Sequence, residues 1–507
     1  MIARLDRLLG RVTMYALVLG ALGVIAVTAE VLVLGGQLSY APLAIPLSAA
    51  VLLAASALTH LIVGLITRTR PQLSSSLITA LLLLFIFDPT VDPAALGVLA
   101  IASAVAVLSK YLLAVRGRHV FNPAAVSAFL VGLVFSTLPV NTFVSWWVGT
   151  PPMFIVSALA FVVVLFRTRR LLVGVVGVAA YAVVSVAVSA ANGGAVLDGV
   201  STASLSSPIV FFAAFMLSEP LTLPPRRWQQ LAEALLVGAL AGVPFSFGLV
   251  SSSPQLALLV GNVLAFFAGQ RRGIRMVVTG RRQLTPSSWE IEFAPRVPVR
   301  FTPGQYVELA LPHARSDARG GRRVFSIASA PGDGSRLTVA TRVTTPPSTF
   351  KRRLLDLQPG DRVAATSVGG DFVLPANSAH PLLLVAGGIG ITPFISQLVH
   401  LRESGDTRDV VLLYAVSTAD DVAYAAELDA ADCRVIVVSR EEPGAVPDGW
   451  EWVTVERLTG DTVLTAVPDA TTRTTYLSGP PRMVGDLRRA LRTAGARRIR
   501  TDVFLGS

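Results

Sequence analysis

The sequence predicts a multidomain membrane protein: a ten-helix α-helical bundle in two inverted five-helix repeats, then an antiparallel β-barrel, then an α/β nucleotide-binding domain. Of the 507 residues, 52% are hydrophobic and only 15% are charged, whereas soluble domains usually carry about 25% charge. The charge is also uneven, because residues 1–272 contain 15 Lys or Arg and 7 Asp or Glu, and residues 273–507 contain 28 and 25. We therefore place domain limits at 1–272, 273–377 and 378–507.

The composition excludes several classes of protein. Cys433 is the only cysteine, so one chain forms no disulfide, cysteine-ligated iron–sulfur cluster or multi-cysteine zinc site. The five histidines leave little for haem, and we expect no metal site. Neither lysine, Lys110 or Lys351, follows a glycine, which excludes a P-loop and argues against ATP-driven transport. The net charge of +11 lies in short runs between apolar segments, which is a membrane pattern and argues against a nucleic-acid partner.

Ten apolar stretches make up the first half of the chain. Several approach the roughly 20 residues that a helix needs to cross a bilayer, and a few are short. The stretches are 14–35, 43–66, 73–88, 94–114, 123–138, 152–166, 171–190, 208–222, 230–248 and 254–270.

The basic residues between these stretches predict the topology. Arginines precede the first stretch, occupy every second loop and follow the last stretch, and the other loops contain no Lys or Arg: Arg4, Arg7, Arg11, Arg68, Arg70, Arg116, Arg118, Arg167, Arg169, Arg170, Arg226, Arg227, Arg271 and Arg272. The positive-inside rule then places both termini in the cytoplasm of a multi-pass protein, which we assign to a bacterial plasma membrane. No small-residue cleavage site ends the first stretch, so we expect no signal peptide.

An internal repeat is visible at an offset of 131 residues. Asp88–Pro93 ends the third stretch and Glu219–Pro224 ends the eighth, and both read acid-Pro-three residues-Pro. Pro123 opens the fifth stretch and Pro254 opens the tenth. Two copies of five spans would be inverted relative to each other. The alternative is that prolines simply end membrane helices in both places.

Acidic residues in apolar surroundings are the second notable feature of this half. Asp88 and Glu219 lie at membrane depth or at its edge, where they either mark a site at the repeat interface or cap helices in water. Glu30 and Glu233 lie within spans, where pairing or snorkelling explains them equally well.

The segment after the seventh stretch, Asp198–Ser204, reads as a small, polar, flexible loop on the outer side. It resembles the flavin-attachment sequence Asp-Gly-x-Ser-Gly-Ala-Thr/Ser, except that Thr202 stands where glycine is usual. The resemblance implies that a flavin transferase esterifies FMN onto Ser204. A plain Ser/Thr/Gly loop is the alternative.

Two further segments of this half resemble known membrane subunits. Phe121–Ala124 and Phe215–Pro220 are similar to segments in the D subunit of Rnf complexes and the B subunit of sodium-pumping NADH:quinone reductase. Those subunits have ten spans in two inverted repeats and an FMN on the outer face. The resemblance therefore implies the same architecture here, with covalent FMN at Ser204.

Short runs with period-two alternation follow from Arg275. They are separated by Gly and Pro, and they predict a small antiparallel barrel to about residue 377. The runs are Met276–Val278, Glu290–Phe293, Tyr306–Leu309 and Leu337–Ala340.

Beyond residue 377 the pattern is that of a parallel α/β domain. The apolar run Leu382–Ala386 meets the glycine-rich turn Gly387–Pro393, a helical stretch follows, and further apolar runs at 410–416, 434–438 and 474–478 alternate with helices. Glycines between a strand and a helix allow a phosphate-bearing ligand to approach the backbone and the helix N-terminus. The turn is not the G-x-G-x-x-G fingerprint, so by itself it is a weak signal.

The neighbouring motifs make the turn specific. In order and spacing, Pro303–Tyr306, Arg323–Ser329, Gly369–Phe372 and Ser478–Met483 resemble those of ferredoxin–NADP reductase-type flavoproteins. This resemblance covers residues 275–507. It implies an NAD(P)H-dependent flavin oxidoreductase that holds FAD on the barrel and NADP or NAD on the α/β domain.

The resemblance also implies residue roles. Arg323 would neutralise the FAD diphosphate, and Phe325 replaces a tyrosine that packs on FAD. Ser326 near flavin N5, Ser478 in place of a cysteine beside the nicotinamide, and Asp502 as the C-terminal acid are the candidate catalytic residues. Further cofactor contacts are implied for Tyr306, Ser348, Phe372, Gly388, Gly390, Thr392, Gly479, Pro480 and Phe504. Arg440, with Ser417, would bind the 2′-phosphate of NADPH, which leaves the choice between NADPH and NADH open.

Together the two halves predict a transmembrane oxidoreductase. Cytoplasmic NAD(P)H would reduce FAD, and electrons would cross the membrane domain to the outer FMN and then to a quinone or an extracytoplasmic acceptor. The hydrocarbon core is ~30 Å thick, so an intermediate carrier is needed. A haem-type ferric reductase or NADPH oxidase-like enzyme is one alternative, although His60 and His119 are the only histidines in the first half. A redox-coupled ion pump is the other.

Overall fold

The computed structural model of this chain describes residues 14–67, 73–115, 118–137, 143–268, 273–311, 321–343, 345–443 and 446–504. These residues form two compact units, one up to residue 268 and one from residue 273. Each unit is described by itself below.

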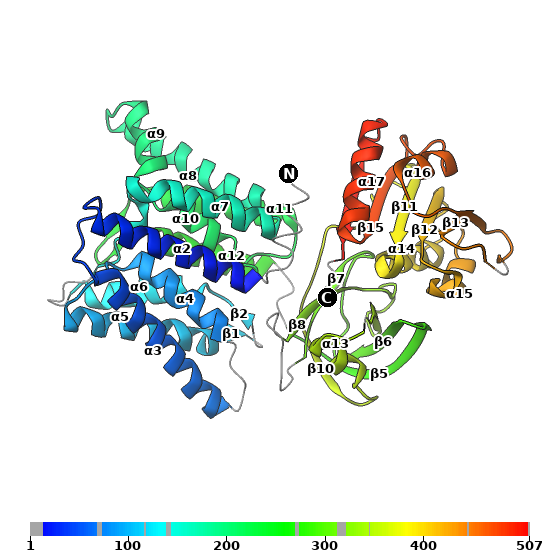
Figure 1. Cartoon of the computed structure of the whole chain (residues 1–507), viewed down its shortest axis with the longest axis horizontal. Helices are drawn as coiled ribbons and strands as arrows, with labels where there is room; N and C mark the ends of the chain where they lie inside the picture. Colours follow the sequence, from blue (N-terminus) through cyan, green and yellow to red (C-terminus); the bar gives the residue numbers. More distant parts are fainter. Residues whose placement is uncertain are drawn as a thin grey trace. The chain divides into compact units, whose positions relative to one another are not determined.

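The first unit is helical (Figure 1). Its helices are α2 (Met14–Leu34), α3 (Ala44–Thr67), α4 (Leu73–Ile86), α5 (Pro93–Leu112), α6 (Pro123–Phe135), α7 (Phe154–Thr168), α8 (Leu171–Ala191), α9 (Val196–Leu205), α10 (Ile209–Phe212), the π-helix η3 (Ala213–Leu217), α11 (Arg227–Gly242) and α12 (Pro254–Ala268). Short elements join them: β1 (Ala114–Val115), β2 (Arg118–His119), η1 (Trp147–Gly149), η2 (Pro151–Met153), β3 (Ser246–Phe247) and β4 (Val250–Ser251).

Each of the ten predicted apolar stretches overlaps at least one of these helices. Within the described residues, five helical segments are long and apolar enough to cross a membrane: α2, α3, α5, Pro151–Thr168 and α8. Others are shorter, and the eighth stretch is divided between α10 and the π-helix η3. A complete ten-span bundle therefore stays a prediction.

Helix ends recur at the offset seen in the sequence. α4 ends at Ile86 and η3 at Leu217, and α6 begins at Pro123 and α12 at Pro254, which are 131 residues apart in both cases. The packing recurs too, since α3 packs on α5 and α8 packs on α11. Both features are consistent with two five-helix repeats.

The predicted outer loop is the clearest difference from expectation. Asp198–Ser204 lies inside α9, so the prediction of a flexible loop is wrong. At Gly199 a Cβ would lie 3.1 Å from Cα of Val186 and 3.2 Å from Cβ of Ser189. Small residues therefore let α9 pack closely on α8, beside which Figure 1 draws it. The side chains of Asp198, Thr202 and Ser204 lie outside the described part.

The second unit begins with an antiparallel sheet in the order β8-β7-β10-β5-β6-β9. Its strands are β5 (Ile274–Thr285), β6 (Ser288–Pro295), β7 (Tyr306–Ala310), β8 (Arg322–Ser326), β9 (Leu337–Arg342) and β10 (Arg362–Gly369), and α13 (Thr349–Leu355) precedes β10. The four predicted runs lie in β5, β6, β7 and β9. One isolated bridge, Ile327 to Val339, joins the two ends of the sheet, so full closure into a barrel stays a prediction.

A parallel sheet follows, in the order β14-β13-β12-β11-β15-β16. Its strands are β11 (Leu382–Gly387), β12 (Val410–Ala415), β13 (Arg434–Ser439), β14 (Glu451–Thr454), β15 (Thr474–Gly479) and β16 (Ile499–Val503). The helical elements are η4 (Gly388–Ile391), α14 (Thr392–Glu403), η5 (Ala419–Asp421), α15 (Ala425–Asp429), α16 (Gly460–Ala466) and α17 (Pro481–Thr493).

The central strand β11 has every residue buried, as strands covered by helices on both faces require. Leu382, Leu384 and Ala386 pack into the same core as α14, whereas Leu383 and Val385 share a core with α17. From β11 the chain runs to β12 on one side and later returns to β15 on the other. Such a reversal of strand order places ligand binding at the carboxyl ends of the strands.

Candidate functional site

The glycine-rich turn lies at the carboxyl end of β11. Gly388 has φ +54°, and nothing lies within 4 Å of the position that its Cβ would take. At Gly390, by contrast, a Cβ would lie 2.6 Å from the carbonyl oxygen of Ser478 and 2.8 Å from Cα of Gly479. The turn therefore packs against the end of β15 at Gly390. At Gly388 the backbone is unobstructed, which would allow a dinucleotide to approach it.

Ser478 lies beside this turn on β15, paired with Ala386 of β11 and Asp502 of β16. Its side chain is fully buried, and its Oγ has no hydrogen-bond partner in the part of the chain that the structure describes. A buried hydroxyl without a partner is costly, so this oxygen fits a role in contacting a ligand. Gly479, with φ +147°, and Pro480, at the N-cap of α17, then turn the chain away.

The three predicted catalytic residues come together from three distant parts of the sequence. Ser326 ends β8, is 6% exposed, and donates from Oγ to Oδ2 of Asp502 at 3.4 Å. Asp502 is the strand partner of Ser478. The group therefore combines two hydroxyls with one carboxylate, a set that can position a ring and exchange a proton.

Arg323 and Phe325 lie on one face of β8, two residues apart. Both contact Phe350 of α13: the Arg323 guanidinium lies 5.2 Å from the ring centroid, and the Phe325 ring stacks at 5.9 Å and 28°. Ser348 caps the same helix, because its Oγ accepts from the Lys351 N–H at 3.3 Å. A guanidinium close to the start of a helix can bind the negatively charged oxygens of a diphosphate. Phe350, which contacts both Arg323 and Phe325, was not among the residues predicted from the sequence.

Tyr306 pairs with Ser326 on one side and with Gly369 on the other. Its ring lies against Gly370, whose φ is +112° and whose Cβ would lie 3.0 Å from the ring. The ring of Phe372 packs in the core, 5.6 Å from Phe394 and 5.2 Å from Tyr476. Its contact with a cofactor stays a prediction.

The remaining predicted residues lie at the same edge of the parallel sheet. Thr392 starts α14, is buried, and donates to the Ile389 carbonyl at 3.1 Å. Phe504 follows β16 and its N–H bonds the Gly479 carbonyl at 3.0 Å. Arg440 follows β13, is exposed, and bonds the Glu456 carbonyl at 3.2 Å.

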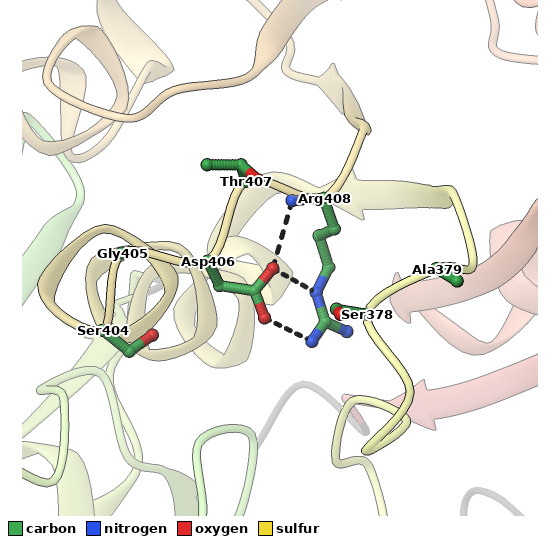
Figure 2. Close-up of a pocket in the computed structure, with 7 residues that line it drawn as sticks. All are labelled: Ser378, Ala379, Ser404, Gly405, Asp406, Thr407 and Arg408. Atoms are coloured by element: carbon green, nitrogen blue, oxygen red, sulfur yellow. Dashed lines mark hydrogen bonds and ion pairs between the residues drawn. The ribbon is translucent and has the colours of Figure 1, made fainter.

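A pocket of about 460 Å³ lies elsewhere in this unit (Figure 2). Asp406 and Arg408 form a two-pronged ion pair there, with Nη2 to Oδ2 at 2.6 Å and Nε to Oδ1 at 3.0 Å, and the hydrogen bonds from Arg408 lower the pKa of Asp406. The lining residues are Ser378, Ala379, Ser404, Gly405, Asp406, Thr407 and Arg408. They precede β11 and β12, at the amino ends of the strands, so this pocket is not the candidate ligand site.

In the helical unit, Asp88 follows Phe87, which comes directly after α4 and forms an isolated bridge with Val144. Its Oδ1 accepts from the Tyr40 hydroxyl at 3.0 Å and from the Ser145 hydroxyl at 2.7 Å. Both contacts come from segments outside the helices, so Asp88 has hydrogen-bond donors for its charge.

Glu219 is half-buried and belongs to a polar network whose other members are buried. Its Oε2 accepts from Nδ2 of Asn122 at 2.9 Å, and the Asn122 N–H donates to Oδ1 of Asn262 at 2.8 Å. Nδ2 of Asn262 reaches Oε1 of Glu233 at 3.4 Å. Sequence reasoning missed Asn262, although an amide in an apolar helix is itself a signal. The network joins the start of α6 to α11 and α12.

Comparisons with known proteins bear on the second unit as a whole. A family model, "Oxidoreductase NAD-binding domain", matches residues 384–489. The reductase component of propane 2-monooxygenase from Rhodococcus jostii is 29% identical over 219 residues, 42% of this chain and 57% of that protein. An NADPH oxidoreductase from Mycobacterium tuberculosis is 30% identical over 230 residues, 44% of this chain and 58% of that protein.

A flavohemoprotein from Bacillus thuringiensis is 32% identical over 136 residues, 26% of this chain and 34% of that protein. Among solved structures, a cytochrome P450 reductase from Amycolatopsis is 26% identical with a TM-score of 0.40, covering 46% of this chain and 70% of that chain. The chain spans a little over half the length of the propane monooxygenase reductase and the NADPH oxidoreductase.

The family model and the sequence relatives confirm that the C-terminal half resembles FAD- and NAD(P)-binding oxidoreductases. The resemblance of the N-terminal half to Rnf and sodium-pumping reductase subunits stays a prediction, as do the individual site residues. The chain therefore carries an NAD(P)H-dependent oxidoreductase domain.

Proposed function

We propose that this protein is a transmembrane flavin oxidoreductase of the cell membrane. It would take electrons from cytoplasmic NAD(P)H, pass them through FAD to a flavin of the helical unit, and deliver them to a quinone or an extracytoplasmic acceptor. The domain limits would be 1–272 for the membrane domain, 273–377 for the FAD domain and 378–507 for the NAD(P) domain.

The observation that carries the proposal is the joining, in one chain, of long apolar helices with an oxidoreductase NAD-binding domain. The two parts also follow each other directly in the sequence, because only the five residues 269–273 separate α12 from β5.

The chain's own residues support the cofactor assignment. Gly388 and Gly390 would bring backbone close to the dinucleotide diphosphate, and Ser478 would orient the nicotinamide through its buried hydroxyl. Arg323 and Ser348 would hold the FAD diphosphate, and Ser326 with Asp502 would hold a proton near the flavin edge. When bound, the nicotinamide supplies a hydride and the flavin accepts it.

The reductase half is tested first by anaerobic addition of NADPH or NADH to the purified full-length protein, following the flavin absorbance band. Bleaching with a saturable dependence on nucleotide is the expected result. If Arg440 binds the 2′-phosphate, Arg440→Ala should lower the affinity for NADPH more than the affinity for NADH. A protein that retains flavin but is bleached by neither nucleotide would refute this half of the proposal.

The outer flavin is tested by in-gel fluorescence of denatured protein co-expressed with a flavin transferase. Ser204→Ala should abolish a fluorescent band, whereas Ser206→Ala, which removes an exposed hydroxyl two residues further on, should keep it. If the wild type shows no band while the transferase labels a control substrate, the proposal of covalent FMN at Ser204 is refuted. A haem Soret band would then direct attention to the ferric-reductase alternative.

A redox-coupled ion pump is a second candidate, and the polar network of Glu219, Asn122, Asn262 and Glu233 favours it. Ionisable groups inside an apolar bundle are costly and typically functional. In vesicles, turnover should then depend on a sodium or proton gradient, and Glu219→Gln or Asp88→Asn should remove that dependence. A turnover rate that changes with neither the sodium nor the proton gradient would exclude pumping.

A further inference from the structure

The connection between β10 and β11 receives hydrogen bonds from two strands of the parallel sheet and from the helix α14 that packs on it. Nε2 of Gln397 on α14 donates to the Phe372 carbonyl at 2.7 Å. The Tyr476 hydroxyl on β15 donates to the Val373 carbonyl at 2.8 Å, and Nη1 of Arg500 on β16 donates to the same carbonyl at 2.7 Å. Phe372 is the last residue of the motif Gly369–Phe372, and Val373 follows it; both lie within residues 273–377, the part that is predicted to hold FAD (the FAD side).

A fourth bond reaches the other FAD-side motif. Oγ of Ser396, the neighbour of Gln397 on α14, donates to the Ser329 carbonyl at 2.6 Å. Ser329 ends the segment Arg323–Ser329, which contains the candidate diphosphate and flavin contacts. Two consecutive side chains of the helix that starts at the glycine-rich turn therefore hold both motifs of the antiparallel sheet.

Burial makes these contacts rigid. Ser396, Gln397 and Tyr476 are fully buried, and the Phe372 ring lies between Phe394 and Tyr476 at centroid distances of 5.6 and 5.2 Å. All four bonds end on backbone carbonyls, so they fix the course of the main chain. Burial also raises the pKa of Tyr476 to about 12, so its hydroxyl stays protonated above the pH near 10 at which an exposed tyrosine ionises.

We propose that Ser396, Gln397 and Tyr476 are positioning residues that set the distance between the glycine-rich turn at Gly388 and the FAD-side segments. The inference rests on the proposed function. It adds that buried side chains outside the predicted cofactor contacts fix the geometry for hydride transfer. None of the three residues is among the predicted cofactor contacts. A misplacement of about 1 Å between reacting groups slows a reaction roughly 100-fold, so small changes in these contacts have a measurable effect.

The test compares Tyr476→Phe with a matched control, Tyr414→Phe, in the full-length protein. Both tyrosines are fully buried on strands that flank β11. The Tyr414 hydroxyl, however, accepts from the Ala423 N–H at 3.3 Å, within the parallel-sheet part of the unit. Each substitution removes one hydroxyl, and only Tyr476→Phe removes a bond to the FAD side.

Three readouts are measured: anaerobic flavin reduction with NAD(P)H and with its C4-deuterated form, NADP⁺ affinity by calorimetry, and hydrogen–deuterium exchange of the peptides around 369–375 and 388–397. We expect Tyr476→Phe to slow reduction about tenfold or more, to retain a deuterium isotope effect, and to leave NADP⁺ affinity within about twofold, since the nucleotide contacts are kept. Exchange should rise in both peptides. Tyr414→Phe should do none of this.

Gln397→Met and Ser396→Ala provide independent variants if Tyr476→Phe loses flavin. Equal reduction rates and equal exchange for Tyr476→Phe and Tyr414→Phe, with Gln397→Met also unchanged, would overturn the inference. A wild type that NAD(P)H does not reduce would instead refute the proposed function, and faster exchange in Tyr476→Phe would then still establish the mechanical link.

Discussion

Gly390→Ala should disrupt the candidate dinucleotide turn. The new Cβ would lie 2.6 Å from the Ser478 carbonyl oxygen and 2.8 Å from Cα of Gly479. Both are backbone atoms, so no side-chain rotation relieves the overlap. Ordinary contact begins at 3.4 Å, and the turn and the end of β15 must therefore separate by about 0.8 Å.

A shift of that size has two consequences. Overpacking of this kind costs about 1–3 kcal/mol of stability. It also moves Ser478 relative to the turn by nearly the ~1 Å that can slow a reaction about 100-fold. We therefore expect flavin reduction by NAD(P)H to fall between about tenfold and about 100-fold.

The assay is anaerobic flavin reduction together with NADP⁺ calorimetry and thermal unfolding. Gly485→Ala is the matched control, because it adds the same methyl group on α17 with no atom within 4 Å. Gly388→Ala shows the effect of backbone strain without steric overlap. Its Cβ would have no atom within 4 Å, and only its positive φ would be strained. If Gly390→Ala binds NADP⁺ and is reduced like Gly485→Ala, the assignment of this turn as the dinucleotide site fails.

Three further predictions follow from the packing. Tyr424→Phe removes a 2.8 Å hydrogen bond to Oε2 of buried Glu290. It should lower the free energy of unfolding by about 1.5–3 kcal/mol, the usual value for a hydrogen bond to a charged group. An unchanged midpoint in a denaturant titration would contradict this. Burial raises the pKa of Tyr476 to about 12 and also raises those of Tyr414 and Tyr424 above the ordinary value near 10. The native state thus keeps protons that the unfolded chain loses, and stability should fall as the pH rises above about 10, with a smaller fall in Tyr424→Phe; equal slopes would refute it. Gly238→Ala places a methyl group on the Gly177 carbonyl where α11 crosses α8, so the purified protein should aggregate in size-exclusion chromatography, whereas Gly97→Ala, with no atom within 4 Å, should not.

The sequence predicted the features that depend on local patterns. Every predicted apolar stretch overlaps a helix, and the runs at 410–416, 434–438 and 474–478 lie in β12, β13 and β15. Continuous apolar stretches and glycine-rich turns are properties of neighbouring residues, so they are readable without the fold. The domain match over 384–489 confirms the interpretation of this part.

Sequence reasoning missed the strands whose residues are partly exposed. β14 and β16 are the edges of the parallel sheet, and their strands Glu451–Thr454 and Ile499–Val503 contain charged residues with no buried position. Edge strands carry polar residues because one side faces solvent, and the alternation that marks a strand is then lost. The helix α9 was missed for a related reason, because Gly, Ser and Thr suggest a loop until α8 supplies a surface for them.

By itself the sequence determined two halves of different character, the helical stretches of the first and the dinucleotide turn of the second, since these follow from hydrophobicity and from glycine at short spacing. Only the tertiary structure decided which residues meet. Ser326 and Asp502 are 176 residues apart, Gln397 and Phe372 are 25 apart, and Asn122 and Asn262 are 140 apart. Such contacts depend on strand order and helix packing, which no local pattern encodes, and they arrange the candidate site.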